Sequence, residues 1–300
     1  MSTTDLARPR PTENRLGTGE LLAVRGLNVS LGKGHGTRIL HDLDLDVGQG
    51  EIVGLIGETG SGKTTLARAI LGLVTPRSGT VELAGTTVSA LRGRKLRAFR
   101  RTGQLQYVFQ DPLRSLDPEL RIGDIVGEGL AVRGIAPAER ETLVRAALER
   151  VGLDPDLAAR EPGRISGGQR QRVAIARSIV LEPRLLICDE PVSALDVSNR
   201  NHILRLLGDL RDQLGMGIVI ISHDLGSLAS LTDRIVVLYR GRVVEQGTAQ
   251  QIFTAPEHPY TQLLIASVPT IDESSGISAT RRRELRAEVS ERVPAEGHRP

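Results

Sequence analysis

A glycine-rich segment, GETGSGKTT at residues 57–65, constrains the fold of this chain more than any other feature. It follows a short apolar run at residues 51–56 and precedes a stretch with helical spacing at 66–73. The segment matches G-x-x-x-x-G-K-[ST], in which glycines between a strand and a helix let backbone N–H groups point at phosphate oxygens. The sequence therefore predicts a phosphate-binding loop (P-loop). Its expected binding residues are Gly57, Glu58, Thr59, Gly60, Ser61, Gly62, Lys63, Thr64 and Thr65.

Within this P-loop, the expected roles are specific. Lys63 is expected to reach the β- and γ-phosphates, and the Thr64 hydroxyl is expected to bind Mg²⁺. Only three of the 39 basic residues are lysines, namely Lys33, Lys63 and Lys95. A compact ammonium fits among phosphates where a planar guanidinium does not, so the lysine at position 63 supports the assignment.

The second half of the chain alternates between helical and apolar strand patterns. From residue 169 a helix, a strand at 185–188, a helix at 200–214, a strand at 217–221 and a helix at 225–231 follow one another. Continuous apolar strands are typical of a parallel sheet covered by helices on both faces. Residues 95–165 are predicted to be mainly helical, with an apolar face on 137–151 made by Leu143, Ala146, Ala147 and Val151. Residues 234–247 indicate a hairpin that turns at Arg240-Gly241.

An acidic pair follows the apolar strand at 185–188. Asp189 is placed to hold Mg²⁺ through water, and Glu190 to orient, or take a proton from, the water that attacks a γ-phosphate. An acidic pair after a strand more often caps a helix. The P-loop earlier in the chain makes the hydrolytic interpretation the better one. Cys188 is read as a small apolar residue of a buried strand.

Two further polar residues are candidates for the same site. His223 follows the strand at 217–221, so a parallel sheet delivers it to the edge where ligands bind. It is predicted to contact the γ-phosphate, although a lone histidine at a strand end is more often structural. Gln110, in YVFQDP, is a candidate ligand of Mg²⁺ or of the lytic water, and an ordinary loop glutamine is the alternative.

The segment ISGGQ at residues 165–169 is a second candidate phosphate site. A Ser-Gly-Gly turn at a helix start gathers free N–H groups and the positive end of the helix dipole. Ser166, Gly167, Gly168 and Gln169 are the residues concerned. Since the P-loop already supplies this chain with one phosphate site, a second needs a different explanation.

Taken in order, these motifs resemble those of the nucleotide-binding subunit of an ABC transporter. They are the P-loop, Gln110, ISGGQ, the strand ending at Asp189-Glu190, SALD at 193–196 and His223. The resemblance covers roughly residues 20–270. It implies an α/β P-loop ATPase with a parallel sheet core, an N-terminal antiparallel β subdomain and a helical subdomain at about 95–168.

The resemblance also implies cofactors and partners. ATP and Mg²⁺ are expected, with Ser166–Gln169 binding the γ-phosphate of ATP held by a second ABC ATPase subunit, identical or related. Ser193 and Asp196 are expected in a loop that crosses between the two subunits. Transmembrane permease subunits and an external solute-binding protein are the further partners implied. The expected location is the cytoplasmic face of the membrane.

Two segments indicate the class of transporter. YVFQDPLRSLDPELRIGDIV at 107–126 and HPYTQLLIASVP at 258–269 resemble the oligopeptide/dipeptide importer ATPases. The expected organisation is an unstructured segment at 1–19, an ATPase domain at 20–255, the HPYT element at 256–270 and an unstructured charged tail at 271–300. The main alternative is a non-transport ABC ATPase, such as a subunit of a phosphonate-breakdown complex. A P-loop kinase is a more distant alternative that ISGGQ and SALD oppose.

One position departs from the family pattern. Family members usually carry an aromatic residue after the first strand to stack on adenine, whereas this chain has Leu31. Weaker apolar contact with the base is the resulting hypothesis.

Composition excludes several other classes. A net charge of +3 and an aromatic content of 2% do not favour nucleic acid as a partner. The single cysteine excludes an internal disulfide, and no cluster built on C-terminal cysteines is expected. No apolar run reaches the length of a membrane span, and the N-terminal residues lack the apolar core of a secretory signal.

Overall fold

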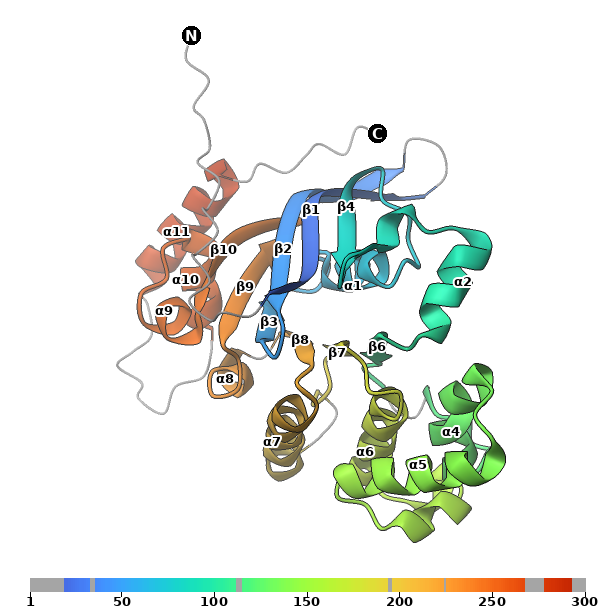
Figure 1. Cartoon of the computed structure of the whole chain (residues 1–300). Helices are drawn as coiled ribbons and strands as arrows, with labels where there is room; N and C mark the ends of the chain where they lie inside the picture. Colours follow the sequence, from blue (N-terminus) through green and yellow to red (C-terminus); the bar gives the residue numbers. More distant parts are fainter. Residues whose placement is uncertain are drawn as a thin grey trace.

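Two β-sheets form the framework of the chain (Figure 1). The computed structural model describes residues 19–32, 36–111, 115–193, 196–223, 225–267 and 278–292. The first sheet has four antiparallel strands in the order β2-β1-β4-β5. Their bounds are β1 Glu20–Leu31, β2 Thr37–Gly48, β4 Ser78–Leu83 and β5 Thr86–Thr87.

The second sheet has six strands in the order β10-β9-β3-β8-β7-β6. All neighbours pair in parallel except β9 and β10, which form the expected hairpin. The bounds are β3 Ile52–Ile56, β6 Leu105–Val108, β7 Leu185–Asp189, β8 Gly217–Ser222, β9 Arg234–Tyr239 and β10 Arg242–Thr248. The predicted combination of a parallel core with an N-terminal antiparallel sheet is confirmed.

The continuous apolar strands of the six-stranded sheet serve two separate cores. In β3, Val53 and Leu55 join a core shared with helix α1 (Lys63–Ile70) and the four-stranded sheet, whereas Ile52 and Ile56 join the core on the other face. Successive strand residues point to opposite faces, so a strand covered on both sides must be apolar at every position. This is why periodicity in these strands is lost from the sequence.

Helices α4 (Ile122–Arg133), α5 (Pro137–Arg150) and α6 (Gly167–Ile179) form a lobe next to β6 and β7 (Figure 1). Helix α2 (Gly93–Arg101) precedes this lobe. The segment 95–165 is mainly helical and irregular, with the short strand β6 inside it. The predicted apolar face of α5 is right at Ala147 and Val151, which are buried, and wrong at Leu143, which is exposed while Val144 and Leu148 are buried. A short helix with several alanines leaves the position of its apolar face ambiguous by one residue.

The remaining helices follow β7 or close the C-terminal part. They are α7 Val197–Leu214, α8 Leu225–Leu228, α9 Ala249–Thr254, α10 Pro259–Ile265 and α11 Ala279–Arg292. The expectation of an unstructured tail is wrong for α11, which packs against α10 and buries Leu285 and Val289. These two apolar residues lie one turn apart, on the same face of an otherwise charged helix. Residues 1–18, 271–277 and 293–300 lie outside the described residues, and so do Ala194 and Leu195 of SALD.

Among the helices that the structure describes, none combines the length and the apolar character needed to cross a membrane.

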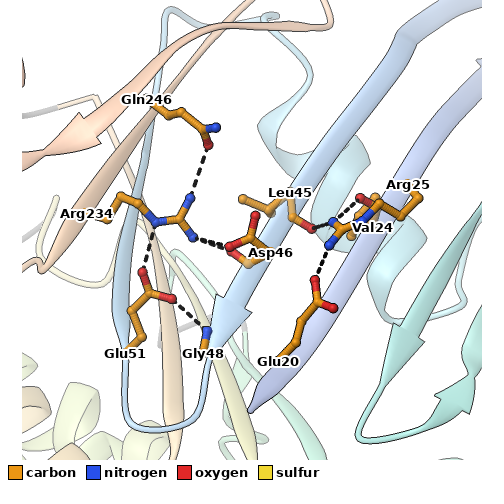
Figure 2. Close-up of polar contacts among 9 residues, drawn as sticks. All are labelled: Glu20, Val24, Arg25, Leu45, Asp46, Gly48, Glu51, Arg234 and Gln246. Atoms are coloured by element: carbon orange, nitrogen blue, oxygen red, sulfur yellow. Dashed lines mark hydrogen bonds and ion pairs between the residues drawn. The ribbon is translucent and has the colours of Figure 1, made fainter. Parts of the chain in front are cut away.

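Arg234 links the two sheets beside the first residues of β3 (Figure 2). Its guanidinium donates to Glu51 Oε1 at 2.9 Å, to Gln246 Oε1 at 3.1 Å and to both Asp46 O and Asp46 Oδ2 at 2.6 and 2.9 Å. The Arg234 side chain is only 13% exposed. Since Asp46 belongs to β2, Glu51 leads into β3 and Gln246 belongs to β10, one side chain connects both sheets. A second arginine in Figure 2, Arg25, pairs with Glu20 at a more exposed position.

We expect Arg234→Met to lower the free energy of unfolding by about 2–4 kcal/mol, because it leaves two partly buried carboxylates without their cation. The matched control is Arg25→Met, whose ion pair with Glu20 is half exposed and should contribute less than about 1 kcal/mol. Urea unfolding followed by circular dichroism measures both. Equal losses in the two variants would contradict the role of Arg234.

Candidate functional site

The P-loop connects β3 to α1 and wraps closely against the sheet. A β-carbon at Gly57 would lie 2.1 Å from the carbonyl oxygen of Leu238 in β9, so only glycine fits there. The turn between β9 and β10 holds the loop from the same side, since Gly241 N donates to Ser61 O at 2.8 Å. Gly62 adopts φ 110°, a left-handed conformation that glycine takes without strain, directly before α1 begins. The glycine pattern of the sequence is thus explained by backbone geometry.

Lys63 is buried at the centre of this loop. Its Nζ donates to the carbonyl oxygens of Gly57 and Glu58 at 2.6 and 2.8 Å. Burial lowers the pKa of Lys63, and the nearby carboxylates of Glu190, Asp189 and Glu58 oppose that shift. An anion arriving at the loop would therefore meet an ammonium that lacks full hydration, which strengthens the attraction.

Asp189 ends β7 beside the start of α1. Thr64 Oγ1 lies 3.4 Å from Asp189 Oδ2, and the hydroxyl of Tyr107 in β6 donates to the same oxygen at 2.5 Å. Burial, reinforced by the bond to Asp189, raises the pKa of Tyr107, so this hydroxyl stays protonated as a donor. Asp189 and Thr64, each predicted to hold Mg²⁺, are brought together.

Glu190 is held in an unusual backbone conformation. Its φ is 47°, in the left-handed region that costs a non-glycine residue about 1 kcal/mol or more. Gln110 Nε2 donates to Glu190 Oε2 at 2.6 Å, and His223 Nδ1 lies 2.8 Å from Glu190 Oε1. Both candidates named from the sequence therefore engage the two oxygens of one carboxylate. In this structure the partner of His223 is Glu190.

These residues line one open cavity of about 690 Å³, here called the central cavity. Strand ends of the parallel sheet, the P-loop and helix α10 all contribute to it, as expected for the carboxyl edge of such a sheet. Its lining consists of Ile39, Gly57, Glu58, Thr59, Gly60, Gly62, Lys63, Thr64, Thr65, Gln110, Asp189, Glu190, His223 and Leu264.

The central cavity fits a phosphate ligand with a magnesium ion. Ser61, within the loop, is buried, and among the described residues its hydroxyl has no hydrogen-bond partner, and the loop offers glycine N–H groups beside Lys63. The side-chain oxygens of Thr64, Asp189 and Gln110 are the hard donors that Mg²⁺ prefers. Within the described ranges no group of three or more His, Cys, Asp or Glu residues could hold a metal ion.

The ISGGQ residues do not line the central cavity. Ser166 caps α6, and its Oγ accepts from Gln169 N at 3.2 Å while Gln169 Oε1 accepts from Ser166 N at 2.9 Å. This capping box gives the two side chains a local role. At this helix start, on the helical lobe, Ser166 and Gly167 are nonetheless exposed and Gly168 is half-buried (Figure 1). Asp196 likewise caps α7 by accepting from Asn199 N at 2.9 Å.

The base-contact hypothesis for Leu31 gains no support from the central cavity. Leu31 is 40% exposed at the end of β1 and is absent from the lining, whose large apolar side chains are Ile39 and Leu264. Residues 33–35, which follow Leu31, lie outside the described ranges.

Sequence reasoning missed two functional contacts. Tyr107 lies in the segment 107–126 that resembles the importer ATPases, and its hydroxyl donates to Asp189. Tyr260 of the HPYT element accepts a hydrogen bond from the P-loop at Glu58 N, 2.9 Å away. The available signal was weak: both are among the three tyrosines of a chain poor in aromatic residues.

Comparisons with known proteins agree with this geometry. The family model described as "ABC transporter" matches residues 40–193. The chain belongs to the ABC transporter ATP-binding family. The oligopeptide transport ATP-binding protein OppF of Streptococcus mutans is 40% identical over 265 residues, which cover 87% of this chain and 84% of that protein. A second model, "Oligopeptide/dipeptide transporter, C-terminal region", matches residues 244–294.

Solved ABC ATPases have the same fold. CbiO1 of Clostridium perfringens, part of the complex cbiONQ, superposes with a TM-score of 0.72 at 30% identity, over 80% of this chain and 93% of that one. The ATP-binding cassette MJ0796, solved as a dimer bound to ADP and Pi, gives 0.69 at 28% identity, over 76% and 99%. The predicted family and fold are confirmed. This ABC ATPase couples ATP hydrolysis to transport.

Cys188 provides a simple test of the sheet that carries the site. It is fully buried in β7, and burial, together with the Asp189 carboxylate, raises the pKa of its thiol. We expect no reaction with Ellman's reagent in the folded chain near pH 8, because both the thiolate and access are lacking. One thiol per chain should react after unfolding in urea. A folded chain that reacts as fast as free cysteine would contradict the burial of β7.

Proposed function

We propose that this chain is the ATP-hydrolysing subunit of an ABC importer for peptides or related small solutes. The observation that carries the proposal is the convergence of the P-loop, Asp189, Glu190, Gln110 and His223 on one cavity, in a chain whose C-terminal part matches the oligopeptide/dipeptide transporter model. That match, and the name of the OppF relative, favour an importer over a non-transport ABC ATPase.

The residues of the central cavity have separate roles in binding ATP and in its hydrolysis. The P-loop N–H groups and Lys63 bind the β- and γ-phosphates of ATP. Glu190 orients the attacking water and takes its proton, and its strained backbone, with the bonds from Gln110 and His223, keeps the carboxylate aimed into the cavity. Gln110 and His223 restrain this carboxylate through its two oxygens. When ATP binds, we assign His223 to the γ-phosphate and Gln110 to Mg²⁺ or the attacking water.

Thr64, Asp189 and Gln110 are the residues that would hold Mg²⁺. When bound, this ion neutralises charge on the phosphate oxygens. Tyr107 donates to the Asp189 oxygen nearest to Thr64, and so fixes the direction of that carboxylate.

The signature residues Ser166–Gln169 are assigned to ATP held by a second ABC ATPase subunit. Their position at a helix start outside the central cavity supports this division, because the N–H groups of Gly167 and Gly168 lie outside the phosphate site of their own chain. MJ0796, a solved relative, is dimeric. Ser193 and Asp196 would lie in the loop that crosses between the two ATPase subunits. Closure of the dimer is then transmitted to permease subunits near Gln110, at the cytoplasmic face of the membrane, with cargo delivered by an external solute-binding protein.

Glu190→Gln tests the hydrolytic role. We expect the variant to bind ATP normally and to lose about 10²–10⁴-fold in kcat, because the amide cannot accept the proton of the attacking water. Steady-state ATPase assays of the purified transporter measure it. Glu149→Gln, an exposed position of α5, is the matched control and should leave kcat unchanged. Near-normal turnover by Glu190→Gln would contradict the assignment.

Ser166→Arg and Ser166→Asp test the shared site. Arginine blocks the helix start, whereas aspartate retains the N-cap but repels a phosphate. We expect both variants to bind ATP as single chains and to lose ATP-driven association with the partner cassette, measured by light scattering. Loss in the arginine variant alone would assign the effect to the helix cap. Full ATPase activity in isolated monomers would overturn the shared site.

A further inference from the structure

The HPYT element reaches the P-loop, although the two are about 200 residues apart in the sequence. Tyr260, in the first turn of α10, accepts a hydrogen bond at 2.9 Å from the backbone N–H of Glu58, the second residue of the loop. Tyr260 is 2% exposed, so water cannot easily replace this bond. Leu264, one turn further along α10, lines the central cavity itself.

Each residue before Tyr260 helps to fix its position. The Glu245 carboxylate of β10 accepts from the backbone N–H groups of Glu257 and His258 at 2.8 and 3.0 Å. His258 then caps α10, since its Nδ1 accepts from Tyr260 N at 3.1 Å, and Pro259 occupies the first helical position. In the HPYT element, His258 thus caps α10, Pro259 begins the helix and Tyr260 contacts the P-loop.

The ring of Tyr260 is also held. It packs on Tyr239 with centroids 4.2 Å apart and an interplanar angle of 33°. Tyr239 ends β9, and the turn that follows it binds the P-loop at Ser61 through Gly241 N. Two neighbouring elements therefore hold the loop at two points, one at Glu58 and one at Ser61. Helix α11 covers α10 from outside, where Arg281 contacts Gln262.

We propose that Tyr260 is a positioning residue of the nucleotide site. Through this residue, nucleotide binding is coupled to the HPYT element, which includes α10. By fixing the Glu58 N–H, the Tyr260 hydroxyl holds the first turn of the P-loop in its binding shape before phosphate arrives. A preorganised loop has less conformational freedom to lose on binding. The proposal rests on the assignment of the central cavity to nucleotide, which Lys63→Ala tests separately.

Tyr260→Phe removes the hydroxyl and keeps the ring. One net hydrogen bond corresponds to about a two- to tenfold change in affinity. We expect ADP to bind that much more weakly to the purified full chain by isothermal titration. In the assembled transporter the KM for ATP should rise by the same factor with kcat unchanged, since the loop grips the ground state and the transition state alike.

Tyr239→Phe is the matched control. It removes a hydroxyl from the other ring of the pair and should leave ADP affinity unchanged. If Tyr260 only anchors α10, its phenylalanine variant will unfold at lower urea concentration but bind ADP as the wild type does, and the proposal is overturned. Equal weakening of ADP binding in both variants would also overturn it.

Hydrogen exchange gives a second readout, because coupling between two sites is reciprocal. Adding ADP to the wild-type chain should slow exchange of the α10 amides, and Tyr260→Phe should reduce that protection. Unchanged exchange in wild-type α10 would overturn the proposal. If Lys63→Ala binds ADP normally, the cavity assignment itself fails. If Lys63→Ala loses binding while Tyr260→Phe retains full affinity, only the role of Tyr260 fails.

Discussion

The close approach of the P-loop to strand β9 is the contact on which the rest of the site depends. Because no β-carbon can stand between Gly57 and the Leu238 carbonyl, the loop lies directly on the sheet, and Lys63 is buried where its Nζ can bridge two loop carbonyls. That position puts Thr64 beside Asp189 at the end of β7. A looser turn would move α1 away from the strand ends and separate the phosphate-binding groups from the acidic pair.

Strain and charge are concentrated at Glu190. The left-handed backbone there is stabilised by ordinary bonds, with Glu190 N donating to Ile221 O at 2.9 Å and Ser193 Oγ donating to Glu190 O at 3.1 Å. The surrounding sheet holds this strained backbone in place. Both faces of the sheet are buried, so neither β7 nor β8 can shift without disrupting two cores. The rigid sheet thus permits a precise direction for the carboxylate. At the other end of the sheet Arg234 ties the antiparallel strands to the same framework.

Much of this arrangement could be predicted because the relevant signals are local. The P-loop glycines, the apolar strands before Asp189 and His223, and the Ser-Gly-Gly turn that begins α6 each depend on a few neighbouring residues. The predictions failed where burial is decided by distant partners. Leu143 and Val144 are equally apolar, and packing against α4 and α6 alone decided which is buried. Helix α11 was missed because two buried side chains in a charged segment give almost no periodic signal.

By itself, the sequence determined the fold class, the family and most of the residues that make up the candidate site, because glycine, lysine and carboxylate chemistry at those spacings permits few alternatives. The tertiary structure alone decided which side chain each of these groups contacts. It joined Gln110 and His223 on one carboxylate, attached Tyr107 to Asp189 and brought Tyr260 from the C-terminal element to Glu58. These contacts span between 33 and 202 residues of chain, and only the packing of the sheets and of α10 sets their distances.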